Sequence, residues 1–72
     1  METKRQKFLR LANARTNKII ETIRLLSNLS NKSNYDYDEL DIDKIFKAID
    51  KEVKIAKNEF RSNEDKKEKF TL

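Results

Sequence analysis

The fold is decided by residues 9–29, which are LRLANARTNKIIETIRLLSNL. From residue 9 to residue 30, apolar or small side chains recur in steps of three and four, at Leu9, Ala12, Thr16, Ile19, Ile23, Leu26 and Ser30. This spacing predicts a helix with one apolar stripe, which Phe8, Ile20 and Leu29 broaden. Thr3 and Gln6 have the spacing of a capping box, so we expect the helix to cover residues 4–30. Asn31 is expected to end it in a left-handed conformation.

A second stripe follows a polar break. Its positions are Ile42, Phe46, Ile49, Val53, Ala56 and Phe60. Asp38 is placed to cap this helix, with acidic residues in its first turns where the helix dipole favours them, and Tyr37 and Ile42 have the spacing of a hydrophobic staple. We therefore expect a loop over residues 31–37, a helix over 38–62 and a charged flexible tail over 63–72.

The predicted fold class is all-α, with an antiparallel helical hairpin as a single domain over residues 3–62. The chain has no Gly and no Pro, which the tight turns of a small β protein favour. Pairing residues whose numbers sum to 68 or 69 matches the two stripes in six layers. The mid-stripe residues Ile19, Ile23, Phe46 and Ile49 are expected to be the most buried. One long helix is the competing fold, and the Ser/Asn-rich break argues against it.

A lone hairpin leaves part of each apolar stripe uncovered. Below about 70–80 residues a single core rarely supplies more than 3–5 kcal/mol. Two hairpins packed as a four-helix bundle would close a common core, so we expect a homodimer. The alternative is a hairpin that docks on a larger protein.

Composition excludes several function classes. The absence of Cys and His removes zinc sites and thiol nucleophiles, and the absence of Gly removes glycine-rich phosphate loops. A calcium loop starting at Asp36 would lack its Gly and place Lys47 at its twelfth position, so the nearby acids are interpreted as capping residues. We expect no enzyme activity, no cofactor and no metal. No apolar run exceeds two residues, so no membrane span is expected, and the predicted location is the cytoplasm.

Positive charge is concentrated in the first half of the chain. Residues 1–33 hold eight Lys or Arg and two acids, whereas residues 34–60 hold five Lys and eight acids. The face of the first helix opposite its stripe carries Lys7, Arg10, Asn17, Lys18 and Arg24. Such a row, doubled in a dimer, is suited to the phosphates of structured RNA or DNA. The ordinary alternative is a solvated face, as in the second helix, where Asp43–Lys47 and Asp50–Lys54 have the i,i+4 spacing of stabilising pairs.

Three apolar residues fall on outer positions and support a second class of function. Leu11, Leu25 and Ile55 lie outside both stripes. They predict a partner contact if the protein is an interaction module such as an adaptor, subunit or inhibitor, although scattered surface apolar residues are also common.

The helix–loop–helix layout, the size and the stripes of residues 9–60 resemble the repressor-of-primer proteins. That family consists of small helical hairpins that pair into antiparallel four-helix bundles and bind paired RNA loops along one face. The resemblance implies a dimeric RNA-binding regulator, but it includes no specific motif and assigns no residue. Residues 28–35, NLSNKSNY, also look like a segment of small uncharacterised proteins from low-GC Gram-positive bacteria and their mobile elements.

Overall fold

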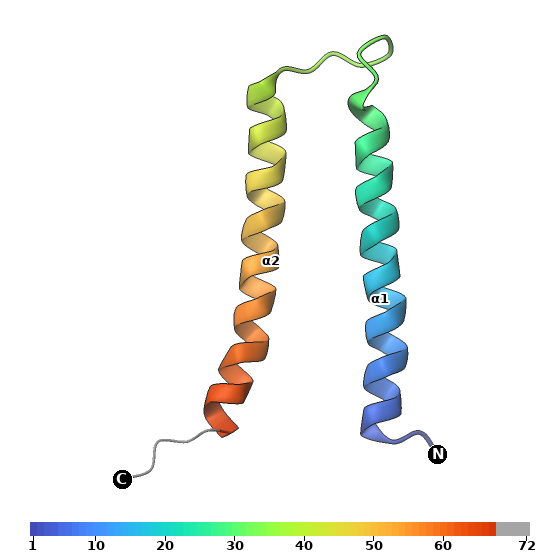
Figure 1. Cartoon of the computed structure of the whole chain (residues 1–72), viewed down its shortest axis with the longest axis vertical. Coiled ribbons are helices and arrows are strands. Elements are labelled where there is room, and N and C mark those ends of the chain that lie inside the picture. The colour runs from blue at the N-terminus through green and yellow to red at the C-terminus, as the bar shows by residue number, and fades with distance from the viewer. Residues whose placement is uncertain (68–72) are drawn as a thin grey trace. The chain divides into compact units, whose positions relative to one another are not determined.

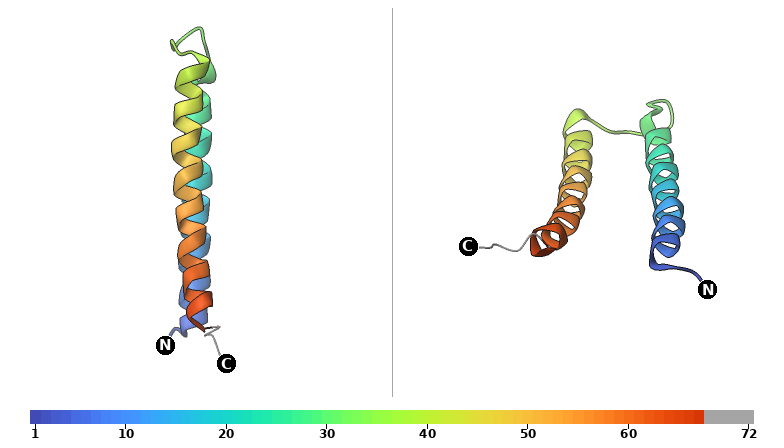
Figure 2. Two further views of the ribbon diagram at one scale, coloured as in Figure 1. Left: turned by 90° about the vertical axis from the view of Figure 1, so that its left-hand side faces the viewer. Right: turned by 60° about the horizontal axis from the view of Figure 1, so that its bottom comes forward.

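The computed structural model describes residues 1–67, with side-chain exposure for residues 1–63. It contains helix α1 (Lys4–Ser27), the short 3-10 helix η1 (Asn28–Ser30) and helix α2 (Glu39–Lys67), and no strand among residues 1–67. Both long helices are continuous ribbons in every view (Figure 1, Figure 2). The all-α class is therefore confirmed. The chain divides into two units, residues 1–36 and residues from 37 on, and each is described by itself.

The start of α1 is the predicted capping box. Thr3 has an extended backbone, and its hydroxyl accepts a hydrogen bond from the backbone N–H of Gln6 at 3.0 Å. The Gln6 side chain returns the contact, accepting from the backbone N–H of Thr3 at 2.9 Å. Two backbone N–H groups that have no partner within the helix are thereby satisfied.

The end of α1 differs from the prediction. The α-helix stops at Ser27, and η1 tightens the chain over the next three residues. Asn31 is not left-handed, with φ −72° and ψ 100°. Its side-chain oxygen instead accepts from the N–H of Ser33 at 3.0 Å, and its carbonyl accepts from the N–H groups of Asn34 and Tyr35, both at 3.1 Å. The expectation for Asn31 was wrong because this Asx turn ends the helical segment without a positive φ.

Asp38 caps α2, as the sequence predicts. Its carboxylate accepts from the backbone N–H of Asp41 at 2.9 Å, and the Asp41 carboxylate accepts from the N–H of Asp38 at 3.0 Å. This reciprocal pair has the connectivity of a capping box with Asp in place of Glu at the third helical position. Tyr37 and Ile42, the predicted staple, are both half-buried.

The end of α2 lies beyond the predicted boundary. The helix continues to Lys67, five residues past the expected end at residue 62, so residues 63–67 of the expected tail are helical. The apolar stripe ends at Phe60, but helix propagation needs only backbone hydrogen bonds and suitable propensity, which Glu, Asp and Lys residues allow. Residues 68–72 of the predicted tail lie outside the described residues.

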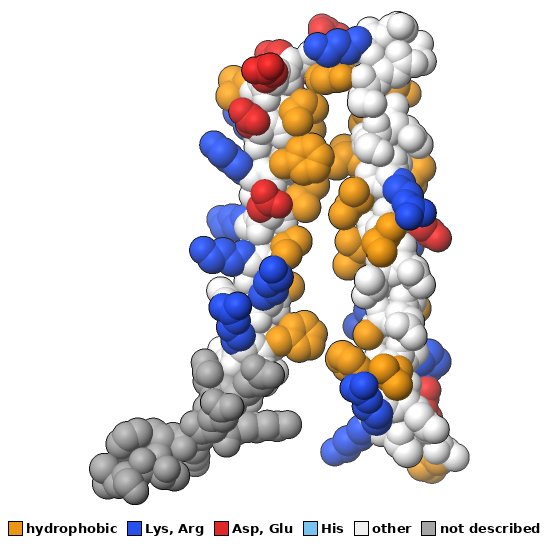
Figure 3. All heavy atoms as spheres, in the orientation of Figure 1, with side chains coloured by type: hydrophobic (Ala, Val, Ile, Leu, Met, Phe, Trp, Pro, Cys, Tyr) orange, Lys and Arg blue, Asp and Glu red, His pale blue; other side chains and the backbone are white. Residues whose placement is uncertain are grey.

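Neither unit has a buried core within residues 1–63. No side chain among residues 1–63 is buried in the single chain. Of the four residues expected to be most buried, only Ile49 is half-buried, whereas Ile19, Ile23 and Phe46 are 60%, 43% and 45% exposed. Side chains along one helix shield one another only through neighbours three and four residues away. Figure 3 shows apolar side chains gathered along one side of α2, which is the surface that needs a cover.

Candidate nucleic-acid interface

The predicted basic face comprises Lys7, Arg10, Asn17, Lys18 and Arg24, and all five residues lie on α1 and are exposed. At about 100° per residue they occupy an arc of about 120°, away from the apolar stripe. Arg10, Asn17 and Arg24 are seven residues apart, so they form one row about 21 Å long. The helix therefore places the five predicted residues on one elongated surface, which is not a pocket.

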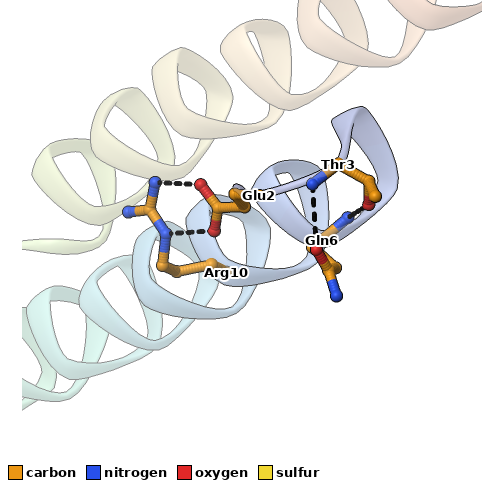
Figure 4. Close-up of polar contacts among 4 residues, drawn as sticks. All are labelled: Glu2, Thr3, Gln6 and Arg10. Atoms are coloured by element: carbon orange, nitrogen blue, oxygen red, sulfur yellow. Dashed lines mark hydrogen bonds and ion pairs between the residues drawn. The ribbon is translucent and has the colours of Figure 1, made fainter.

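Arg10 is held by an ion pair that the sequence analysis missed. Its Nε donates a hydrogen bond to Glu2 Oε2 at 2.8 Å, and its Nη2 donates one to Glu2 Oε1 at 3.0 Å (Figure 4). Both carboxylate oxygens are used, which is the bidentate geometry that Arg also forms with phosphate. Hydrogen bonding to Glu2 raises the pKa of Arg10 and outweighs the lowering by desolvation.

Glu2 reaches Arg10 because of the way α1 begins. Glu2 directly precedes the N-cap residue Thr3, and the capping box fixes the direction in which the chain enters the helix. Figure 4 shows the Glu2 carboxylate directed toward the Arg10 guanidinium, two turns into the helix. The two residues are eight positions apart, so the i,i+3 and i,i+4 rules that find ion pairs within helices do not find this one.

The other members of the basic face are available for a ligand. The side chains of Lys7, Lys18 and Arg24 form no ion pair with any residue the structure describes, and the Asn17 amide makes no hydrogen bond within the same part of the chain. Glu21 lies in the same arc, also without an ion-pair partner among residues 1–67. Three cations and one amide of this face can therefore bind a ligand directly. Arg10 can bind one only if the ligand displaces the Glu2 carboxylate.

The apolar residues of the alternative hypothesis have unequal exposure. Leu11 is half-buried, while Leu25 and Ile55 are 66% and 44% exposed. Leu11, Lys18 and Leu25 are seven residues apart and form a second row on α1, beside the row that contains Arg10. Lys18 therefore belongs to both candidate surfaces of α1, whereas Ile55 lies on α2 and is not part of either.

One basic surface on α2 was overlooked by the sequence analysis. Four lysines of α2 are spaced by three, four and three residues, and we call them the lysine strip: Lys44, Lys47, Lys51 and Lys54. Counting charge by segment hid them, because residues 34–60 are acidic in total. Assigning each charge to a helix face would have found them.

The described residues contain no group of three or more His, Cys, Asp or Glu side chains arranged to hold a metal ion. The acids at the start of α2 are used in capping, since the Asp38 and Asp41 carboxylates both accept backbone N–H groups. No helix within residues 1–67 has the length and apolar composition needed to cross a membrane.

Comparison with protein-family models, curated proteins and solved structures yields no match to this chain.

Proposed function

We propose that the protein is a small dimeric nucleic-acid-binding accessory or regulatory protein that uses the basic face of α1. The observation that carries the proposal is that Lys7, Lys18 and Arg24 are exposed and, within the described residues, without an ion-pair partner. A solvated face on a charged helix usually interleaves both signs, whereas α1 itself holds only one acid, Glu21. An excess of unpaired cations along one side of a helix is suited to a polyanion.

The proposed assembly is an antiparallel hairpin that pairs with a second copy as a four-helix bundle. Each helix carries an apolar stripe whose large side chains are exposed or half-buried in the single chain. Most helical stability in proteins comes from packing an amphipathic face, so these stripes need a partner surface. The register in which Ile23 lies opposite Phe46 and Ile19 opposite Ile49 matches the two stripes without an insertion. A second copy supplies the remaining cover from the same sequence.

The proposed contacts are to the phosphate backbone. Arg24 and Arg10 would bind phosphates, Lys7 and Lys18 would add to the positive field, and Asn17 would be free to hydrogen-bond to sugars or base edges. Lysine and arginine contacts to phosphate fix position without reading sequence. Recognition by such a face would therefore depend on the shape of a structured RNA or DNA element.

The test is an electrophoretic shift with structured RNA and with DNA at two salt concentrations. The double variant Arg10→Glu/Arg24→Glu should lose binding and keep its far-UV circular dichroism, because neither residue belongs to the apolar stripe. Arg15→Glu is the charge-matched control for Arg24→Glu, since Arg15 lies about 180° from Arg24 around α1 and beside the apolar stripe, and its far-UV circular dichroism must match that of wild type before its binding is compared. Wild-type affinity should fall by roughly 0.7–0.9 log units per log unit of salt for each phosphate neutralised. Equal losses from the two single variants would contradict a binding face at Arg24.

The alternative is a protein-interaction module without catalytic activity. It is favoured by the 66% exposure of Leu25, which lies on the outer side of α1 in one row with Leu11. No shift of any nucleic acid at ~50 mM salt, where phosphate contacts are strongest, would favour this alternative. Leu11, Leu25 and Ile55 would then be substituted with Asp in co-purification experiments from the native host.

A further inference from the structure

The lysine strip is a continuous basic surface on α2. The spacing of Lys44, Lys47, Lys51 and Lys54 places the four residues within an arc of about 80° and over about 15 Å of helix. The centre of this arc is about 160° from the centre of the apolar stripe that begins at Ile42. Figure 3 likewise shows most basic side chains of α2 on a different side from its apolar side chains. The strip is therefore outward-facing if the stripe is used for packing.

The cations of the strip are not neutralised by ion pairs. All four lysines are exposed. Asp43 and Asp50 have the favourable i,i+4 spacing to Lys47 and Lys54, yet neither pair approaches within 4.0 Å in the part of the chain described. Exposed i,i+4 pairs stabilise a helix by only ~0.2–0.5 kcal/mol, so a ligand phosphate competes with them easily.

We propose that the lysine strip is a second phosphate-binding surface, which contacts the backbone of a nucleic acid. This inference rests on the proposed function. Four charges over about 15 Å are spaced by about 5 Å, and one strand of a duplex presents a phosphate every 3.4 Å along its axis. A row of lysines with this spacing can therefore contact several phosphates of a duplex at once.

The residue type fits backbone contact better than base recognition. Lysine is a flexible point charge with three donors and no fixed fork, so it attracts phosphate without demanding one orientation. The strip contains no Arg, which is the residue that most often reads a base edge by bidentate hydrogen bonds. The strip accordingly supplies affinity and salt dependence and does not select sequence.

The test compares Lys51→Gln with Lys57→Gln, using the full chain and a fluorescent RNA duplex or DNA duplex. Both variants remove one lysine charge from α2, but Lys57 lies about 120° around the helix from Lys51 and outside the strip. Anisotropy titrations over a range of salt should show the slope of log affinity against log salt reduced by roughly 0.9 for each Lys51 of the dimer that contacts a phosphate, in the variant Lys51→Gln. Lys57→Gln should leave the slope unchanged. Far-UV circular dichroism checks that both variants are folded.

Three outcomes separate the inference from the proposed function. A reduced slope for Lys51→Gln alone supports the strip. If both lysine variants behave like wild type while Arg24→Glu weakens binding, the strip is overturned and the function of α1 stands. If wild type binds neither duplex at ~50 mM salt, the proposed function fails and the inference fails with it.

Discussion

The guanidinium of Arg10 donates two hydrogen bonds, of 2.8 and 3.0 Å, to the carboxylate of Glu2. Arg10 lies in the second turn of α1, on its basic face, and Glu2 directly precedes the N-cap residue Thr3. Because the cap positions Glu2, the conformation at the start of α1 decides whether the charge of Arg10 is paired. A phosphate that binds Arg10 in the same bidentate manner must displace Glu2.

Replacing Glu2 with Gln is expected to increase nucleic-acid affinity by freeing Arg10. Glutamine presents one acceptor oxygen and no charge, so it cannot reproduce the two-oxygen contact. The salt slope should become steeper by roughly 0.7–0.9, because one more phosphate is neutralised when Arg10 is released. Anisotropy titrations with duplex RNA over a range of salt measure both quantities.

The matched control for Glu2→Gln is Glu21→Gln. It makes the same change in net charge within the same unit of the chain, but Glu21 forms no ion pair within residues 1–67. Removing its negative charge should raise affinity through the local field and leave the salt slope unaltered. Identical slopes for the two variants would show that Glu2 does not restrain Arg10 from binding.

The Thr3 cap is expected to stabilise α1 measurably. Thr3→Ala removes the acceptor for the Gln6 N–H and should lower the free energy of unfolding by about 0.5–2 kcal/mol. Thr22→Ala is its control, because the Thr22 hydroxyl donates to the Lys18 carbonyl at 2.7 Å in the middle of α1. That contact contributes little to a helix, and Ala has the higher helix propensity. Urea melts followed by circular dichroism should give Thr3→Ala a clearly lower free energy of unfolding than Thr22→Ala. The reverse order would contradict the role of the cap.

The helix starts could be predicted from sequence and the helix ends could not. Thr3 and Asp38 cap by local hydrogen bonds that depend on residues three positions away, so their pattern is visible in the sequence. The end of α1 depends on a competition between η1, the Asx turn at Asn31 and a left-handed cap, and these differ by small energies. The end of α2 was placed at the last apolar residue, although packing and helix propagation are separate requirements.

The candidate surface was predictable to the extent that it follows helix geometry. Residues seven apart share a face in any α-helix, which is sufficient to group Arg10, Asn17 and Arg24. The Glu2 contact could not be predicted this way, since Glu2 lies outside the helix and its position depends on the capping box. The lysine strip was predictable in principle, but only from charge assigned by face.

We expect the purified chain to be a dimer at micromolar concentration. Folding coupled to association makes the melting temperature rise with protein concentration, because mass action favours the bound state. Sedimentation equilibrium gives the mass, and thermal melts at several concentrations give the linkage. A monomeric mass with a concentration-independent cooperative melt would contradict the bundle and favour docking on a different partner.

The packing role of the apolar stripe can be tested by comparing Ile23→Asp with Leu25→Asp. Both residues lie near the end of α1 and are exposed in the single chain, at 43% and 66%. Ile23 belongs to the stripe that the proposed bundle covers, and a charge placed there would be buried without a partner, which is strongly unfavourable. Leu25 lies on the outer side of α1, where Asp would remain solvated. Its cost there is the difference in helix propensity, about 0.5 kcal/mol, together with an unfavourable interaction with the helix dipole in the last turn, about 0.3–1 kcal/mol. Ile23→Asp should therefore abolish cooperative folding in circular dichroism melts, while Leu25→Asp should still unfold cooperatively, with a modestly lower melting temperature. If Ile23→Asp keeps full helicity and an unchanged melting temperature, the stripe is not the packing surface and the hairpin register fails with it.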